Sequence, residues 1–291
     1  MSAPGFYFNR VHIIESLRQG DDLHTGRPLY NDLGALADAS TPPVKAHLHV
    51  VQSRAQFLEE LRSIAKEARF HAHWPILHIE AHGDFTGIYV TSGEYLPWRE
   101  FQDELIAINE SSRLNLLVVM AACKGAWLSK VIASQVRGRA PMRLLIGPKR
   151  DVEAREIEQA CSVFYRVLFD TGDVGAACRA MNAAVATAPL TFRAFTAEDI
   201  FQRVLHGYFS NYCSEDALVK RENERIAHLE RLGISGEQLE HDRQCFRSRL
   251  RDHRRLFEEF KHRFFFCDLY PENATRFRVT FEDCQRDPSE T

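Results

Sequence analysis

The sequence predicts a three-layer α/β domain with a mostly parallel central sheet, followed by a helical C-terminal extension. Two observations predict this class: short apolar runs without strict alternation recur along the chain, and amphipathic helical patterns separate them. Buried parallel strands are rich in Val, Ile and Leu along their whole length, because helices cover both of their faces. Strands that alternate with such helices are typical of three-layer α/β proteins.

The apolar runs that we expect to form strands are Val11–Ile14, His47–Val51, Ile76–Ala81, Leu116–Cys123 and Leu144–Gly147. Apolar stripes at helical spacing predict helices over roughly residues 57–68, 98–108, 157–168 and 174–181. Asp173 is well placed as the N-cap of the last of these helices. Each predicted helix therefore lies between or after predicted strands, as an α/β fold requires.

Two segments depart from this alternation. Residues 15–45 contain several Gly and Pro residues and little periodicity, which predicts a long irregular insertion after the first strand. A break falls around residues 188–191, after which the chain becomes charged and helical and ends with a strand-like stretch at 276–281. We therefore expect a domain over residues 1–190 and a mainly helical extension over 191–291.

Composition and charge limit the partners that we expect. The 291 residues include 37 Lys and Arg and 40 Asp and Glu, and this near balance gives no reason to expect a nucleic-acid partner. The seven cysteines are widely spaced without a C-x-x-C pair, which favours a reducing compartment over a disulfide framework. The first residues lack a signal-peptide pattern and the longest apolar run is far too short to span a membrane. We expect a cytoplasmic protein with no membrane partner, and the oligomeric state stays open.

Two of the predicted strands lead into residues suited to catalysis. The strand at Ile76–Ala81 is followed directly by His82, and the strand at Leu116–Cys123 ends on a cysteine. In an open α/β sheet, ligands bind beyond the carboxyl ends of the strands. We therefore expect the Cys123 thiol, as nucleophile, and the His82 imidazole, as general acid and base, to meet at this edge.

Neighbouring groups complete this candidate site. The backbone N–H groups of Gly83 and Cys123 are candidates to hold an oxyanion. Asp84 and Glu80 are candidates to supply charge to a substrate pocket, with a structural or solvated role as the favoured interpretation of both. The nearby histidines have no carboxylate or cysteine at a familiar metal-ligand spacing, so we expect no metal site. Thiolate chemistry also needs no organic cofactor.

The order of these motifs resembles that of the caspase-like cysteine peptidases, including their bacterial CHAT-type and metacaspase-like branches. Residues 122–125, Ala-Cys-Lys-Gly, match the last four positions of the caspase signature Q-A-C-x-G, and His82 lies 41 residues before Cys123. The similarity covers roughly residues 45–186. Ala121 stands where caspases have Gln and metacaspase-like enzymes have Asp, so neither specificity for Asp nor for Lys and Arg is carried over.

The resemblance implies a thiol protease that cuts a protein substrate through a Cys123–His82 dyad, as bacterial relatives do in defence or stress systems. Residues 124–143 leave little room for an activating cut before the next strand, so we expect a single chain controlled by a partner protein or by its C-terminal region. Two alternatives stay open. One is an amidase or glutaminase that uses a downstream histidine, His206 or His228; the other is an inactive caspase-like binding module.

Overall fold

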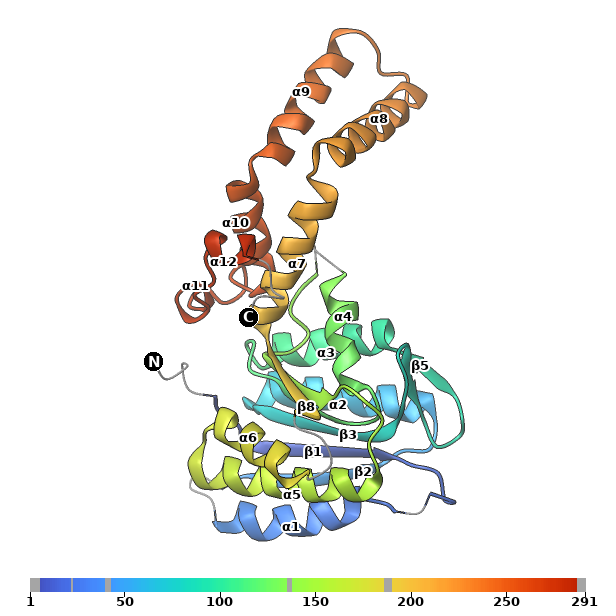
Figure 1. The fold of residues 1–291 in the computed structure, drawn as a ribbon, viewed down its shortest axis with the longest axis vertical. Helices are drawn as coiled ribbons and strands as arrows, with labels where there is room; N and C mark the ends of the chain where they lie inside the picture. Colours follow the sequence, from blue (N-terminus) through green and yellow to red (C-terminus); the bar gives the residue numbers. More distant parts are fainter. Residues whose placement is uncertain (1–5, 22, 40–42, 135–137, 186–189, 287–291) are drawn as a thin grey trace. The chain divides into compact units, whose positions relative to one another are not determined.

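The computed structural model describes residues 6–21, 23–39, 43–134, 138–185 and 190–286 (Figure 1). The chain divides into two compact units. The first unit comprises Met1–Ile132 and Ala140–Ala197, and the second comprises Ala133–Arg139 and Glu198–Thr291. In the described residues the strands belong to the first unit and the second unit is helical.

A mixed, mostly parallel sheet forms the centre of the first unit. Its main strands follow the order β2 (Lys45–Val50), β1 (Arg10–Ser16), β3 (Pro75–Gly83), β6 (Leu117–Ala121), β7 (Leu144–Pro148) and β8 (Phe192–Thr196). β8 pairs antiparallel with β7, and the other neighbours in this order are parallel. Two short strands, β4 (Gly87–Tyr89) and β5 (Tyr95–Pro97), extend from the end of β3 as an antiparallel hairpin. The predicted α/β class is confirmed, and the five predicted strands correspond to β1, β2, β3, β6 and β7.

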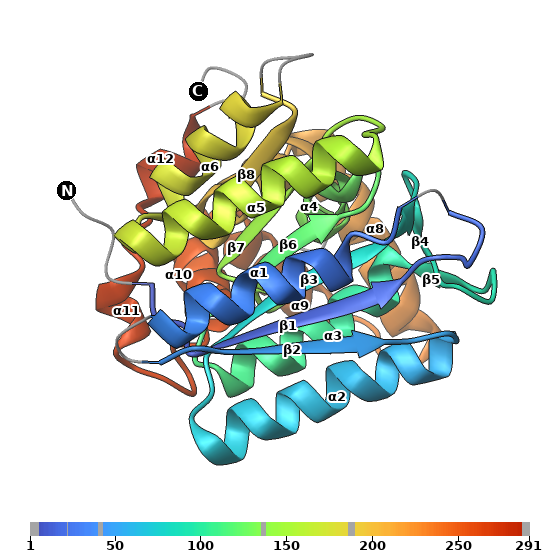
Figure 2. The same ribbon diagram turned by 90° about the horizontal axis from the view of Figure 1, so that it is seen from below.

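Helices cover both faces of the sheet, as Figure 2 shows. One face carries α1 (Gly26–Ala39), α5 (Ala154–Thr171) and α6 (Val174–Ala184), and the other carries α2 (Arg54–His71) and α3 (Trp98–Ser111). Alternate strand residues such as Val11, Ile13 and Ile76 join Phe164 and Leu168 of α5 in one buried cluster. After β6 the chain forms a short 3-10 helix, η1 (Gly125–Trp127), and then α4 (Leu128–Ala133). Because helices pack on both faces of the sheet, the predicted three-layer arrangement is confirmed.

The expectation of an irregular insertion over residues 15–45 is wrong for residues 26–39, which form α1. Pro28 lies in the first turn of the helix, where a proline costs no intrahelical hydrogen bond. Leu29 and Leu33 are buried in the core below it. The irregular part that remains is the loop from residue 17 to residue 25, whose residue 22 lies outside the described residues.

The ends of the chain differ from the sequence expectation in two further places. The strand-like stretch at 276–281 is not a strand, since it lies between α11 (Asn273–Arg276) and α12 (Phe281–Gln285). Thr280 ends it by capping α12, because its hydroxyl accepts a hydrogen bond from the Asp283 N–H. The edge strand β8 was not predicted, since two of its five residues are exposed and its apolar pattern is weak.

The second unit contains α7 (Ala197–Tyr212), α8 (Glu215–Arg231), α9 (Glu237–Arg251) and α10 (His253–Phe264). Its core is aromatic: the Phe201 ring centroid lies 5.0–5.9 Å from those of Phe257, Phe264 and Phe265. Phe264, Phe265 and Phe266 are all buried in this core. None of the helices in the described part of the chain has the length and apolar character needed to cross a membrane.

Three histidines lie against α2 on the face of β1 and β2. The His12 ring stacks on His47 and His49 with centroids 5.1 and 5.4 Å away, and its Nδ1 lies 3.1 Å from His49 Nε2. His49 Nδ1 in turn lies 3.0 Å from a carboxylate oxygen of Glu60 on α2. Burial, and then the neighbouring histidines, lower the pKa of His12 from 6.5 to about 3.

This cluster makes the first unit sensitive to acid. As pH falls from 6.5 toward 3, the unfolded chain binds a proton at His12 that the native chain does not. The free energy of unfolding then falls by up to about 1.4 kcal/mol per pH unit from this residue alone. We expect His12→Gln to flatten that dependence in urea titrations at several pH values. The exposed His228→Gln is the control, and equal slopes in both variants would contradict the assignment.

Candidate active site

A pocket of about 250 Å³ lies at the carboxyl ends of β1, β3, β6 and β7. The chain passes from β1 to β2 on one side of β1 and then to β3 on the other, which makes this a topological switch point where α/β proteins bind ligands. The lining residues are Leu17, Asp21, Leu23, Thr25, Glu80, Ala81, His82, Ala121, Cys123, Val152, Ala154 and Ile157. The structure thus brings together four residues singled out in the sequence, namely His82, Cys123, Glu80 and Ala121.

Cys123 lies two residues beyond β6 at the edge of this pocket. Its thiol is half-buried, and Sγ lies 3.8 Å from the carbonyl oxygen of Val152. Arg150, from the same loop as Val152, is close enough for its guanidinium to interact with the charge of a thiolate at Cys123.

A sharp turn after Cys123 separates it from the following helix. Lys124 has a φ of 57°, in the left-handed region that non-glycine residues seldom occupy. A Cβ atom at Gly125 would lie 2.5 Å from Met120 Cβ, so glycine is required where the chain folds back over β6. Residues held in this way cluster at functional sites. The turn leaves the Cys123 N–H without a hydrogen-bond acceptor among the described residues.

The backbones that carry His82 and Cys123 lie in direct contact. A Cβ atom at Gly83 would lie 2.7 Å from the Cys123 carbonyl oxygen and 3.3 Å from Ala122 Cβ. Only a residue without a Cβ permits this approach. The Gly83 and Cys123 backbones are therefore adjacent, as the oxyanion-site prediction requires.

His82 has a carboxylate partner that the sequence did not reveal. Its Nε2 lies 2.8 Å from Asp21 Oδ2, and the two side chains are 47% and 23% exposed. An ionised carboxylate only accepts hydrogen bonds, so Nε2 is the nitrogen that donates to Asp21, and in the neutral ring Nδ1 is the nitrogen with the lone pair. Asp21 therefore supplies the hydrogen-bond acceptor for the His82 ring. No hydrogen bond joins the His82 ring to Cys123 in the described structure.

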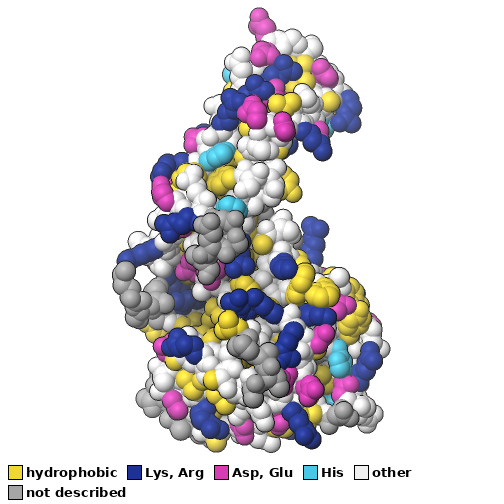
Figure 3. Space-filling view, in the orientation of Figure 1, with side chains coloured by type: hydrophobic (Ala, Val, Ile, Leu, Met, Phe, Trp, Pro, Cys, Tyr) yellow, Lys and Arg dark blue, Asp and Glu magenta, His cyan; other side chains and the backbone are white. Residues whose placement is uncertain are grey.

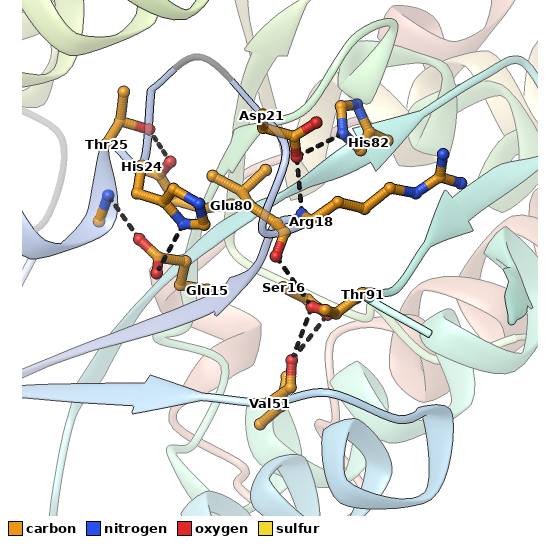
Figure 4. A network of polar contacts seen from close by, with 12 residues as sticks. Glu15, Ser16, Arg18, Asp21, His24, Thr25, Val51, Glu80, His82 and Thr91 are labelled. Carbon is orange, nitrogen blue, oxygen red and sulfur yellow. Dashed lines mark hydrogen bonds and ion pairs between the residues drawn. The ribbon is translucent and has the colours of Figure 1, made fainter. Parts of the chain in front are cut away.

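The loop after β1 holds Asp21 in place, as Figure 4 shows. Asp21 accepts a hydrogen bond of 2.6 Å from the Arg18 N–H and donates its own N–H to the Arg18 carbonyl. At the base of the loop, the Ser16 hydroxyl donates to Val51 O, and the Thr91 N–H donates to Ser16 Oγ. Burial raises the pKa of the Asp21 carboxyl, but its hydrogen bonds with His82 and the Arg18 N–H outweigh this and hold the pKa below 3.8.

Glu80 forms the buried floor of the pocket. One of its carboxylate oxygens accepts a hydrogen bond from the Thr25 hydroxyl, and the other lies 3.0 Å from His78 Nε2. His78 Nδ1 lies 3.1 Å from the Tyr165 hydroxyl of α5. Because both oxygens are engaged, Glu80 lines the pocket without presenting an unpaired charge to it.

Asp84 has a structural role in the turn between β3 and β4. Its carboxylate accepts hydrogen bonds from the Thr86 N–H and hydroxyl, the Gly87 N–H and the Tyr89 hydroxyl. Burial raises the pKa of Asp84, but these hydrogen bonds outweigh it and leave the pKa below its ordinary value. Asp84 is not among the pocket-lining residues, so its candidacy for the substrate pocket is not supported.

Neither a metal site among the described residues nor a matching protein indicates what this pocket binds. Within the described ranges, no group of three or more His, Cys, Asp or Glu side chains is arranged to hold a metal ion. His206 and His228 lie on α7 and α8, and the residues that line the Cys123 pocket include neither of them. Comparison of the chain with protein-family models and with curated proteins finds no match. The site is therefore interpreted from its own geometry.

Replacement of Asp21 tests its control of the His82 tautomer. We expect nitrogen NMR of the wild type at neutral pH to show the proton on Nε2, and Asp21→Asn to give a mixture, because an amide both donates and accepts. Since the native pKa of Asp21 lies below 3.8, this pairing stabilises the fold above pH 3.8 and is lost as pH falls through the native value. Asp151→Asn, at an exposed partner of Lys124, is the control. An unchanged tautomer in Asp21→Asn would contradict the assignment.

Replacement of Gly83 tests the backbone contact. Gly83→Ala forces a methyl group against the Cys123 carbonyl, and we expect a loss of about 1–3 kcal/mol in unfolding free energy. Gly34→Ala in α1 is the matched control, since a Cβ there meets no atom within 4 Å and alanine favours helix. Equal melting temperatures for the two variants would show that the backbones are not in contact.

Proposed function

We propose that this chain is a cysteine endopeptidase of the caspase-like kind, with Cys123 as nucleophile, His82 as general acid and base, and Asp21 as the residue that orients His82. One observation carries the proposal: a half-buried thiol and a carboxylate-paired imidazole line one pocket at the carboxyl ends of adjacent parallel strands. The free N–H of Cys123 beside the Gly83 backbone supplies the start of an oxyanion site.

The tautomer set by Asp21 defines the direction of proton transfer. His82 Nδ1 takes the thiol proton as Cys123 Sγ attacks the peptide carbonyl carbon, and the Cys123 N–H donates to the resulting oxyanion. The C–N bond then breaks and Nδ1 returns the proton to the leaving amine, which leaves a thioester on Cys123. Nδ1 next takes a proton from water as its oxygen attacks the thioester, and returns it to the departing sulfur.

The pocket walls favour an apolar substrate side chain next to the cut bond. Leu17, Leu23, Val152 and Ile157 supply aliphatic surface, and Ala121 leaves space without charge. Since both oxygens of Glu80 are hydrogen-bonded at the floor, a basic substrate side chain would have to break an existing pairing. The substrate class is therefore a protein cut beside a small or medium apolar residue.

The cellular setting is part of the same proposal. All seven cysteines are free, which suits a reducing compartment such as the cytoplasm. Between β6 and β7 the chain forms η1 and α4, so we propose a single-chain enzyme that needs no cut in this segment. Control then falls to a protein partner or to residues 191–291, and intact mass of the active protein checks the single chain.

Thiol labelling tests the proposed dyad. With an acyloxymethyl-ketone probe we expect Cys123→Ala to abolish rapid labelling and His82→Gln to slow it by about a hundredfold or more. Cys178→Ala is the control, because Cys178 is also half-buried but burial raises its pKa to about 12. In a proteome digest, peptides cut by the wild type and not by Cys123→Ala should end at apolar residues.

Other outcomes would overturn the proposal. Equal labelling of the wild type and Cys123→Ala, with the label spread over other cysteines, would point to an inactive binding module. Release of ammonia from glutamine by the wild type, without peptide cleavage, would point to an amidase.

A further inference from the structure

The second unit contains a larger pocket, of about 540 Å³, between α7, α8, α9 and α10. Pockets that bind small molecules fall in this range of volume. Its lining differs from that of the Cys123 pocket, because it includes four arginines: Arg221, Arg225, Arg249 and Arg263. Figure 3 shows basic and acidic side chains interleaved over this unit, so the pairing of each arginine decides what charge the pocket offers.

Two of the four arginines have carboxylate partners. Arg225 forms a bidentate pair with Asp242, with distances of 2.5 and 2.7 Å, and Arg249 lies 2.9 Å from Glu259. Glu259 also accepts a hydrogen bond from Arg255. These two acids are the carboxylates that line the pocket, and each is already paired with an arginine.

The other two arginines, Arg221 and Arg263, have no carboxylate partner among the described residues. Arg221 donates to the Tyr212 carbonyl at 2.9 Å and to the Tyr208 hydroxyl at 3.4 Å. Its guanidinium also lies 5.7 Å from the Tyr208 ring centroid and 6.0 Å from that of Phe246. Neutral acceptors and ring faces hold this cation in place without cancelling its charge.

We propose that this pocket binds a small molecule that carries phosphate groups. Two unmatched guanidiniums on different helices, α8 and α10, give the pocket an excess of two positive charges. Planar guanidiniums bind phosphate oxygens in bidentate fashion, and one polyphosphate has enough acceptors to reach both helices. The volume exceeds that of a single phosphate, which favours an organic phosphate. This inference is independent of the chemistry at Cys123.

The exposed thiol of Cys245 allows the test to be made at the pocket itself, since Cys245 lines it. The full chain is alkylated with a maleimide in the presence of ATP, pyrophosphate or citrate at constant ionic strength, and mass spectrometry follows each cysteine. We expect ATP and pyrophosphate, and not citrate, to slow alkylation of Cys245 saturably while Cys123 is unaffected. Calorimetry supplies the affinity.

Arg221→Gln and Arg263→Gln should each weaken ATP binding by about tenfold or more, because each removes a charged hydrogen-bond donor. Arg231→Gln on α8, outside the pocket lining, is the matched control. Thermal unfolding of all variants separates loss of binding from loss of fold. The proposal is overturned if neither ATP nor pyrophosphate protects Cys245 at millimolar concentration, if citrate protects equally, or if the double variant binds as the wild type does.

Discussion

The candidate active site depends on the close approach of the backbones at the ends of β3 and β6. These strands pair in parallel up to Glu80 and Ala121, and each chain continues beyond the last pair. At that point Gly83 faces the Cys123 carbonyl without a Cβ, so the two chains stay together after the ladder ends. The sulfur is thereby placed at the rim of the sheet and not in its core. Cys123 lines the pocket from that position.

Cys123 and Cys161 both belong to the first unit, but their surroundings differ. Glu80 is paired on both oxygens, which allows a carboxylate to lie in the core at acceptable cost. Cys161 lies on α5 in the same interior, where burial and then the charge of Glu80 raise its pKa well above the ordinary value. A thiol in that setting is inert. Cys123 is instead half-buried at the edge of the sheet, where it lines the pocket.

The parts of the fold and site that repeat a local pattern could be predicted from the sequence. β1, β3, β6 and β7 are buried and largely apolar, and His82 and Cys123 lie at the carboxyl ends of β3 and β6. Asp21 could not be predicted, because it lies 61 residues before its partner in a loop without periodicity. Its position comes from contacts between distant segments, such as Thr91 with Ser16, which no local pattern records. The sequence offers one signal for Asp21. It lies in the loop after the first strand, at the edge of the sheet where α/β proteins bind ligands.

Asp21 contacts both the pocket and the His82 imidazole. An imidazole that is 47% exposed and unpaired would exchange between tautomers, and only one of them leaves Nδ1 free to take a proton. The Asp21 carboxylate fixes that tautomer, yet Asp21, Leu17 and Leu23 also form one wall of the pocket. A side chain that enters the pocket therefore touches the same loop that orients His82. A displacement of Asp21, Leu17 and Leu23 would therefore change the surroundings of His82 and the shape of the pocket together.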